Sequence, residues 1–136
     1  MADLVALAFH VEGEPIPQGS MKAFVRGKRA VLVSDNPRLK AWRERVKQAA
    51  VEAADGRRFR KDAALRLSMD FVLPRPKTVK RDHPTVPPDA DKLYRAIGDA
   101  ISDSGIWADD AQVVDGHPTK RYGEPGVHIE IREVGT

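Results

Sequence analysis

The chain has 136 residues, a formal net charge of +3 and no cysteine. Its length is typical of one domain with its own hydrophobic core, and the lack of cysteine excludes disulfides and thiolate metal sites. No apolar run approaches membrane-spanning length, and the N-terminus lacks the basic start and small-residue cleavage site of a signal peptide. We therefore expect a cytoplasmic protein with no membrane segment and a single domain over residues 1–136.

Charge is unevenly distributed along the chain. Residues 22–61 contain 13 Lys and Arg against 4 Asp and Glu, a balance of +9, whereas residues 99–115 contain 5 Asp and no Lys or Arg. A basic surface around an acidic pocket suits a metal-dependent enzyme that acts on a polyanion such as a nucleic acid. Ordinary segregation of surface charge is the alternative, and charge alone does not decide between them.

A strand and a hairpin are predicted near the N-terminus. Apolar residues alternate over 5–11, which is typical of a strand with one buried face. A hairpin is predicted over 24–33, because Gly27 suits a tight turn between two apolar runs. Cations on and beside this hairpin could bind a DNA backbone or simply keep an exposed hairpin soluble: Lys22, Arg26, Lys28 and Arg29.

A basic amphipathic helix follows the hairpin. Asn36 and Pro37 are typical of the N-cap and first residue of a helix, and Gly56 is typical of its end. Trp42 falls on the apolar stripe, so we expect it in the core rather than stacked on a DNA base. Four cations at positions 57–61 predict an exposed, mobile loop after this helix.

A second strand and a proline-rich loop come next. Apolar residues alternate again over 64–73, which predicts a strand. Prolines in the loop 74–88 restrict it before binding and so lower the entropy that it would lose against a ligand. We interpret this loop as an arm that contacts the substrate, with an inert connector as the alternative. Its candidate DNA contacts are Lys77, Lys80 and Arg81.

The C-terminal third predicts a helix and two strands. Residues 91–104 carry apolar side chains at helical spacing, and Gly105 is suited to end the helix. Strands are predicted over 112–120 and 127–134. Because the intervening residues 123–126 are typical of a turn, we predict that these two strands pair with each other as an antiparallel hairpin.

Aspartates gather at both ends of the predicted helix. Asp89 and Asp91 stand where the loop becomes the helix, and Asp109 and Asp110 follow its end. A single Asp at the start would be explained as an N-cap. Two acids at a bend can face one side, and the later pair would converge on them if the next strand lies beside the helix. Such carboxylates repel one another unless a cation neutralises them, which predicts Mg²⁺ with several retained waters.

Two cations lie within the same helix. Arg95 is four residues after Asp91 and so on the same helical face. A surface ion pair of about 0.3–0.5 kcal/mol is one interpretation, and a cation that stabilises charge developing on a phosphate is the other. Lys92 could contact DNA in the same way or merely point to solvent.

The segment PDADKLYRAIGDAISDSGIWADDAQV, residues 88–113, resembles the signature of the RusA family of Holliday-junction resolvases, metal-dependent endodeoxyribonucleases of bacteria and their phages. PIPQGSMKAFVRGKRAVLVSDNPRLKAWR, the RPK loop and PGVHIEI also resemble phage-type members, so the resemblance spans nearly the whole chain. It implies a compact α/β (α+β) unit with a small mixed sheet and two main helices. It also implies a homodimer that nicks two opposed strands of branched DNA, the four-way junction.

The resemblance also implies roles for individual residues. The family's metal-binding aspartates fall on Asp89, Asp91 and Asp110, with Mg²⁺ or Mn²⁺ as the ion. Its catalytic lysine falls on Arg95, and its usual asparagine after the second aspartate falls on Lys92. Arginine keeps the charge but does not release a proton, so we predict phosphate binding rather than acid catalysis at this position. Two alternatives stay open: a junction-binding module that has lost cleavage, and a nuclease for flaps or forks.

Overall fold

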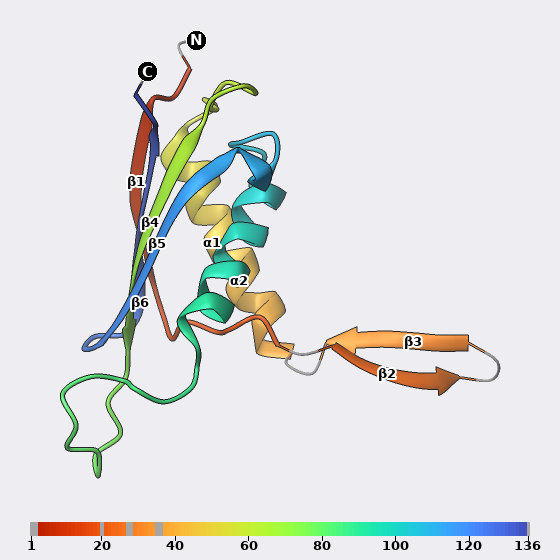
Figure 1. Ribbon diagram of the computed structural model, residues 1–136, viewed down its shortest axis with the longest axis vertical. Helices are drawn as coiled ribbons and strands as arrows, with labels where there is room; N and C mark the ends of the chain where they lie inside the picture. Colours follow the sequence, from red (N-terminus) through yellow and green to blue (C-terminus); the bar gives the residue numbers. More distant parts are fainter. Residues whose placement is uncertain (1–2, 20, 27–28, 35–36, 136) are drawn as a thin grey trace.

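The computed structural model describes residues 3–19, 21–26, 29–34 and 37–135, with side chains for all of these except 21–34. Figure 1 shows one α+β domain: a four-stranded mixed sheet with two helices on one face, and a two-stranded ribbon that projects from this body. In chain order the elements are β1 (Ala6–Glu12), β2 (Met21–Arg26), β3 (Arg29–Ser34), α1 (Pro37–Ala54), β4 (Leu65–Leu73), α2 (Ala90–Ser104), the 3₁₀ turn η1 (Asp110–Gln112), β5 (Val113–Tyr122) and β6 (Gly126–Glu133).

The four-stranded sheet has the order β1-β6-β4-β5. β4 pairs antiparallel with β6, where Met69 lies opposite Ile129, and parallel with β5, where Met69 lies opposite Pro118. Successive side chains of a strand point to opposite faces, so alternate residues of β4 meet the helices. These inward residues are all buried: Leu65, Leu67, Met69 and Phe71. The strand predicted over 64–73 is confirmed and carries much of the core.

The predicted pairing of the last two strands is wrong. Both strands form near the predicted positions, but β4 lies between them and pairs with each. Their connection crosses the end of β4, where the Gly123 N–H donates to the Leu73 carbonyl at 3.0 Å. A Cβ on Gly123 would lie 2.9 Å from Cγ1 of Val72, so glycine permits this close crossing. The turn residues do reverse the chain, but the apolar β4 buries more surface between two strands than at an edge.

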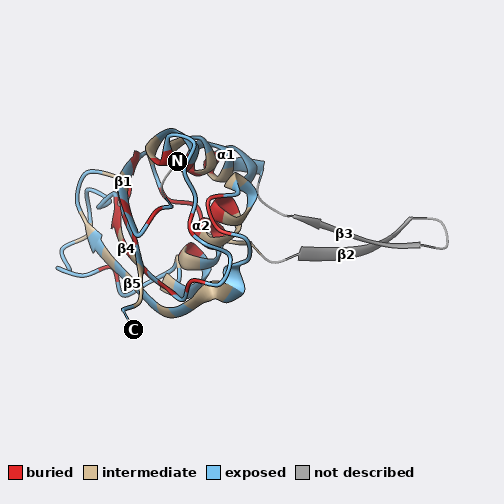
Figure 2. Ribbon diagram, turned by 90° about the horizontal axis from the view of Figure 1, so that it is seen from above, coloured by how far each residue is buried: buried red, intermediate tan, exposed pale blue. Residues whose placement is uncertain are grey.

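Both helices bury one apolar stripe against the sheet and each other, and Figure 2 shows the buried positions gathered between these layers. Trp42 in α1 is 3% exposed, as predicted for a core residue. Neither helix, within the described part of the chain, is long and apolar enough to cross a membrane. The buried stripe of α2 consists of Leu93, Ala96, Ile97, Ala100 and Ile101. This stripe fixes the rotation of α2 and therefore decides which polar side chains face η1 and β5.

The ribbon of β2 and β3 confirms the hairpin predicted over 24–33. The two strands pair antiparallel, with Arg26 opposite Arg29 beside the turn. The side chains of all four candidate DNA contacts in this region, Lys22, Arg26, Lys28 and Arg29, lie outside the described residues. Their contact with DNA therefore stays a prediction.

Candidate active site

Asp89 is the residue at which the loop 74–88 enters α2. Its backbone is extended (φ −72°, ψ 142°), as an N-cap requires, and its carbonyl accepts a hydrogen bond from the Leu93 N–H at 3.1 Å. Its carboxylate does not cap the helix but lies 3.9 Å from Lys92 Nζ, with 55% of the Asp89 side chain exposed. The N-cap interpretation thus explains the backbone of Asp89 and leaves its carboxylate free of the helix N–H groups.

Further along α2, Asp91, Arg95 and Asp99 line a pocket of about 500 Å³. Residues four apart lie one turn above another, which places these three in a row on one helical face. Asp91 and Arg95 form no ion pair with each other or with any other described residue. The surface ion pair that sequence spacing allowed is therefore not formed. The rest of the pocket wall consists of Leu67, Tyr94, Gly98, Trp107, Asp110 and Val113.

Asp109 and Asp110 differ in what their carboxylates do. Asp109 is the N-cap of η1: its carboxylate accepts a hydrogen bond from the Ala111 N–H at 2.9 Å, and the Gln112 side chain completes a capping box. The Ala111 bond, followed by a side-chain hydrogen bond with Asp110, holds the pKa of Asp109 below its usual range. Asp110 instead lines the pocket. The acid that faces the pocket is the one to which the family motif assigned a metal.

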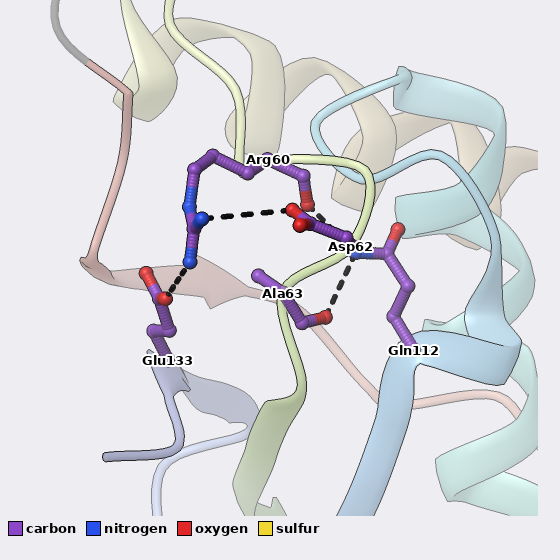
Figure 3. A network of polar contacts seen from close by, with 5 residues as sticks. All are labelled: Arg60, Asp62, Ala63, Gln112 and Glu133. Carbon is purple, nitrogen blue, oxygen red and sulfur yellow. Dashed lines mark hydrogen bonds and ion pairs between the residues drawn. The ribbon is translucent and has the colours of Figure 1, made fainter. Parts of the chain in front are cut away.

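Gln112 fixes the η1 turn against the loop that follows α1 (Figure 3). Its amide nitrogen donates to the carbonyls of Arg60 and Ala63 at 2.9 and 3.0 Å. Its amide oxygen accepts from the N–H groups of Ala108 and Asp109 at 2.8 and 3.2 Å. The amide therefore joins the backbone just before Asp110 to the loop that follows α1. Sequence reasoning missed this residue, although Asp followed by Gln at the third position is a capping-box pattern.

Arg60 connects the same loop to the sheet, as Figure 3 also shows. Its guanidinium pairs with Glu133 of β6 and lies 3.6 Å from the carboxylate of Asp62. The hydrogen bond to Glu133 is the main cause that raises the pKa of Arg60. The four cations at positions 57–61 are exposed, as predicted, while Phe59 among them is buried. The mobility of this loop stays a prediction.

The pKa of Asp110 is raised above its usual range. The main cause is the hydrogen bond to Asp109, and burial and the charges of Asp109 and Asp99 add to it. Neighbouring carboxylates disfavour the ionised form of an acid unless a cation lies between them. Sequence reasoning did not select Asp99, although it lies eight residues after Asp91 and therefore on the same helical face.

The arrangement of these acids fits a weakly chelated, water-rich cation. Among the described residues, no three His, Asp or Glu side chains are close enough to surround a metal ion by themselves. Asp91 and Asp110 line one pocket, whereas Asp89 is not among its lining residues, so a site shared by all three stays a prediction. Mg²⁺ usually takes one or two carboxylates, several waters and substrate phosphates. An open pocket with acids on two walls suits that mode of binding.

The proline-rich loop 74–88 is attached to the end of β5. The guanidinium carbons of Arg75 and Arg81 lie 5.0 and 5.9 Å from the ring centre of Tyr122, and Arg81 donates to its hydroxyl at 2.9 Å. Lys120 Nζ donates to two carbonyls at the end of the loop, both at 2.9 Å. Lys120 of β5 therefore places a positive charge beside the residues that lead into Asp89. The candidate DNA contacts of this region are all exposed: Lys77, Lys80, Arg81 and Lys92.

Comparison with known proteins matches residues 12–132 to the family described as Endodeoxyribonuclease RusA. Among curated proteins, none matches the chain. The matched range contains both helices, β4, β5 and every residue that lines the pocket. The residues of the candidate site therefore all lie within the part of the chain that the family describes.

Proposed function

The chain belongs to the RusA family of endodeoxyribonucleases, and on this premise we propose that it resolves four-way DNA junctions by metal-assisted phosphodiester hydrolysis. The observation that carries the proposal is the pocket that Asp91 and Arg95 of α2 line together with Asp110 of η1. Hydrolysis of a phosphodiester needs carboxylates for a cation and a guanidinium for the phosphate, and that of Arg95 is unengaged within the described part of the chain. The protein would act as a homodimer, in the cytoplasm of a bacterial or phage-infected cell.

Asp91 and Asp110 would hold Mg²⁺ or Mn²⁺, with Asp89 at the start of α2 as a third ligand. When bound, such an ion polarises the phosphate and lowers the pKa of a bound water. The closeness of Asp110 to Asp109 and Asp99 supports this assignment, because a cation would relieve the repulsion between these carboxylates when they are ionised. α2 positions the Asp91 carboxylate and η1 positions the Asp110 carboxylate. The buried stripe fixes the backbone of α2, and Gln112 fixes that of η1.

Arg95 would bind the scissile phosphate. It is exposed, lines the pocket and has no ionic partner among the described residues. A guanidinium stays charged at any physiological pH, so it can offset negative charge in the transition state but cannot serve as the acid that protonates the leaving group. This restriction distinguishes the chain from family members that carry lysine at the same point of the motif.

The basic loop 74–88 and the ribbon of β2 and β3 would hold the arms of the junction. Their cations are suited to phosphate oxygens, which position a protein on DNA without reading its sequence. Lys92, beside Asp89 at the start of α2, would add a contact close to the cleaved bond. Recognition would therefore depend on the shape of the branched DNA more than on its bases.

Incubation of the purified protein with a labelled four-way junction, a fork and a linear duplex, each with Mg²⁺ or with EDTA, tests the proposal. Paired nicks in the junction alone, in Mg²⁺ alone, are expected. Asp91→Asn should remove nicking and leave junction binding in EDTA intact, whereas Asp103→Asn, an acid of the same helix that pairs with Arg43, should behave as wild type.

The other outcomes separate the two alternatives. Salt-sensitive junction binding without product at any metal concentration would identify a binding module. Preferential cutting of the fork would identify a different structure-selective nuclease. Equal activity in EDTA, or full activity of Asp91→Asn, would overturn the metal-assisted mechanism.

A further inference from the structure

Tyr94 brings a phenol hydroxyl to the candidate active site. It lies on α2 between Asp91 and Arg95, is half-buried and lines the same pocket. No described residue forms a hydrogen bond with its hydroxyl, and the oxygen is not among the buried polar atoms that lack a partner. The hydroxyl is thus not completely enclosed, and it has no hydrogen-bond partner among the described residues.

The backbone of β5 is shaped to receive this ring. Gly116 stands opposite Leu67 in the sheet, and a Cβ at Gly116 would lie 2.3 Å from the Tyr94 hydroxyl oxygen and 2.9 Å from the ring carbon that bears it. Real side chains do not tolerate such distances, so any other residue at Gly116 would displace the ring. Glycine inside a strand usually weakens the strand. The close packing of the Tyr94 ring therefore explains why position 116 carries glycine.

The pocket offers few hydrogen-bond donors for a phosphate. Asp91, Asp99 and Asp110 repel an anion, and the indole N–H of Trp107 already donates to the Ser102 hydroxyl at 2.9 Å. Of the described side chains that line the pocket, Arg95 and Tyr94 retain an unengaged donor. The two are consecutive in α2, so both reach the pocket from the same turn.

We propose that the Tyr94 hydroxyl donates a hydrogen bond to a non-bridging oxygen of the scissile phosphate, which makes it a catalytic residue beside Arg95. This inference rests on the proposed nuclease function and adds one group to it. A neutral donor stabilises charge that develops on the phosphate without attracting the metal-binding carboxylates away from their ion. The hydroxyl would contribute more in the transition state, where those oxygens carry more charge, than in the bound junction.

Tyr94→Phe tests the hydroxyl while it keeps the ring that packs on Gly116. Single-turnover cleavage of the four-way junction should become about 100-fold slower, as when one oxyanion donor is removed. The dissociation constant of the junction, measured in Ca²⁺ or EDTA, should stay within about twofold of wild type, because phosphate contacts elsewhere dominate binding. Thr119→Val is the matched control: it removes a hydroxyl from β5 that donates to Asp70 at 3.0 Å, and should leave the rate unchanged.

A phosphorothioate junction separates contact with the substrate from a structural effect. Sulfur in place of the contacted non-bridging oxygen accepts hydrogen bonds poorly. One diastereomer should therefore lower the cleavage rate of the wild-type protein by a much larger factor than it lowers the rate of the Tyr94→Phe variant. The other diastereomer should slow both proteins by the same factor. Gly116→Ala displaces the hydroxyl. It should therefore lower the cleavage rate strongly when Tyr94 is present and only weakly when it is combined with Tyr94→Phe.

The possible results are distinguishable. An unchanged cleavage rate in Tyr94→Phe, or equal effects of sulfur on the two proteins for both diastereomers, would overturn the role of the hydroxyl and leave the nuclease function intact. A wild-type protein that cuts no branched DNA in Mg²⁺ or Mn²⁺ would overturn the proposed function, and this inference with it.

Discussion

Two aspartates of this chain occupy the same structural position, yet their carboxylates do different things. Asp89 begins α2 and Asp109 begins η1, both with extended backbone. The Asp109 carboxylate bonds the backbone of its turn, whereas the Asp89 carboxylate forms no capping hydrogen bond. Each has an acidic neighbour, Asp91 or Asp110, that lines the pocket. The comparison teaches that an acid near a helix start has to be judged by its side-chain bonds and not by its position.

The largest expected effect is a difference in cleavage activity between substitutions at Asp110 and at Asp109. Asp110→Asn should lower junction cleavage more than about 1000-fold, because it removes a charged ligand from the pocket. Asp109→Asn should stay within about tenfold of wild type, because asparagine caps a helical turn as well as aspartate does. Gel-based nicking assays in Mg²⁺ measure both. Equal losses of cleavage activity in the two variants would show that the two acids act as a unit, and would contradict the separate roles given to them.

Removal of the amide that holds η1 should affect stability as well as activity. Gln112→Ala should lower the free energy of unfolding by about 2 kcal/mol, since four backbone groups lose their partner and are only partly resupplied by water. Urea denaturation measures this, and nicking should fall as the position of Asp110 loosens. Gln48→Ala is the control, because among the described residues Gln48 bonds only Glu44, on the exposed face of α1. A stability change no larger than that of the control would contradict the role given to Gln112.

The two N-cap aspartates should differ in thermal unfolding. Asp109→Ala should lower the unfolding temperature by about 3–5 °C, because it removes a capping hydrogen bond that the structure contains. Asp89→Ala should change it by about 1 °C or less, because no such bond is lost. Calorimetry without metal provides the measurement. A larger effect at Asp89 would reverse the distinction between the two helix starts.

The smallest effect concerns pH. The pKa of Asp110 is raised in the folded protein, so the folded state takes up this proton more readily and its stability falls as pH rises through that range. Asp110→Asn should therefore unfold at a slightly higher temperature than wild type at neutral pH without metal. The difference should disappear in acid, where Asp110 is protonated. Mg²⁺ should raise the unfolding temperature of wild type but not of the variant; identical curves in all conditions would contradict a charged, metal-binding Asp110.

Local pattern was enough to identify the elements and the family. The apolar alternation of β4 and the helical stripe of α2 depend on which side of an element is buried, and that information is present in a short stretch of residues. The motif around Asp91 and Asp110 predicted the RusA family, which the match over residues 12–132 confirms. The capping pattern of Asp109 and Gln112 was also present in the sequence and could have assigned Asp109 a structural role.

Tertiary structure alone decided which strands pair and which side chains of α2 reach the pocket. The turn before β6 predicted a hairpin, but the central place of β4 depends on contacts between strands far apart in the chain, which local spacing does not encode. Likewise, Asp99 and Tyr94 have ordinary helical positions in sequence, and they reach the pocket because packing fixes the rotation of α2 against η1 and β5. Burial in a shared core sets these distances, and a core forms only when all of its layers are present.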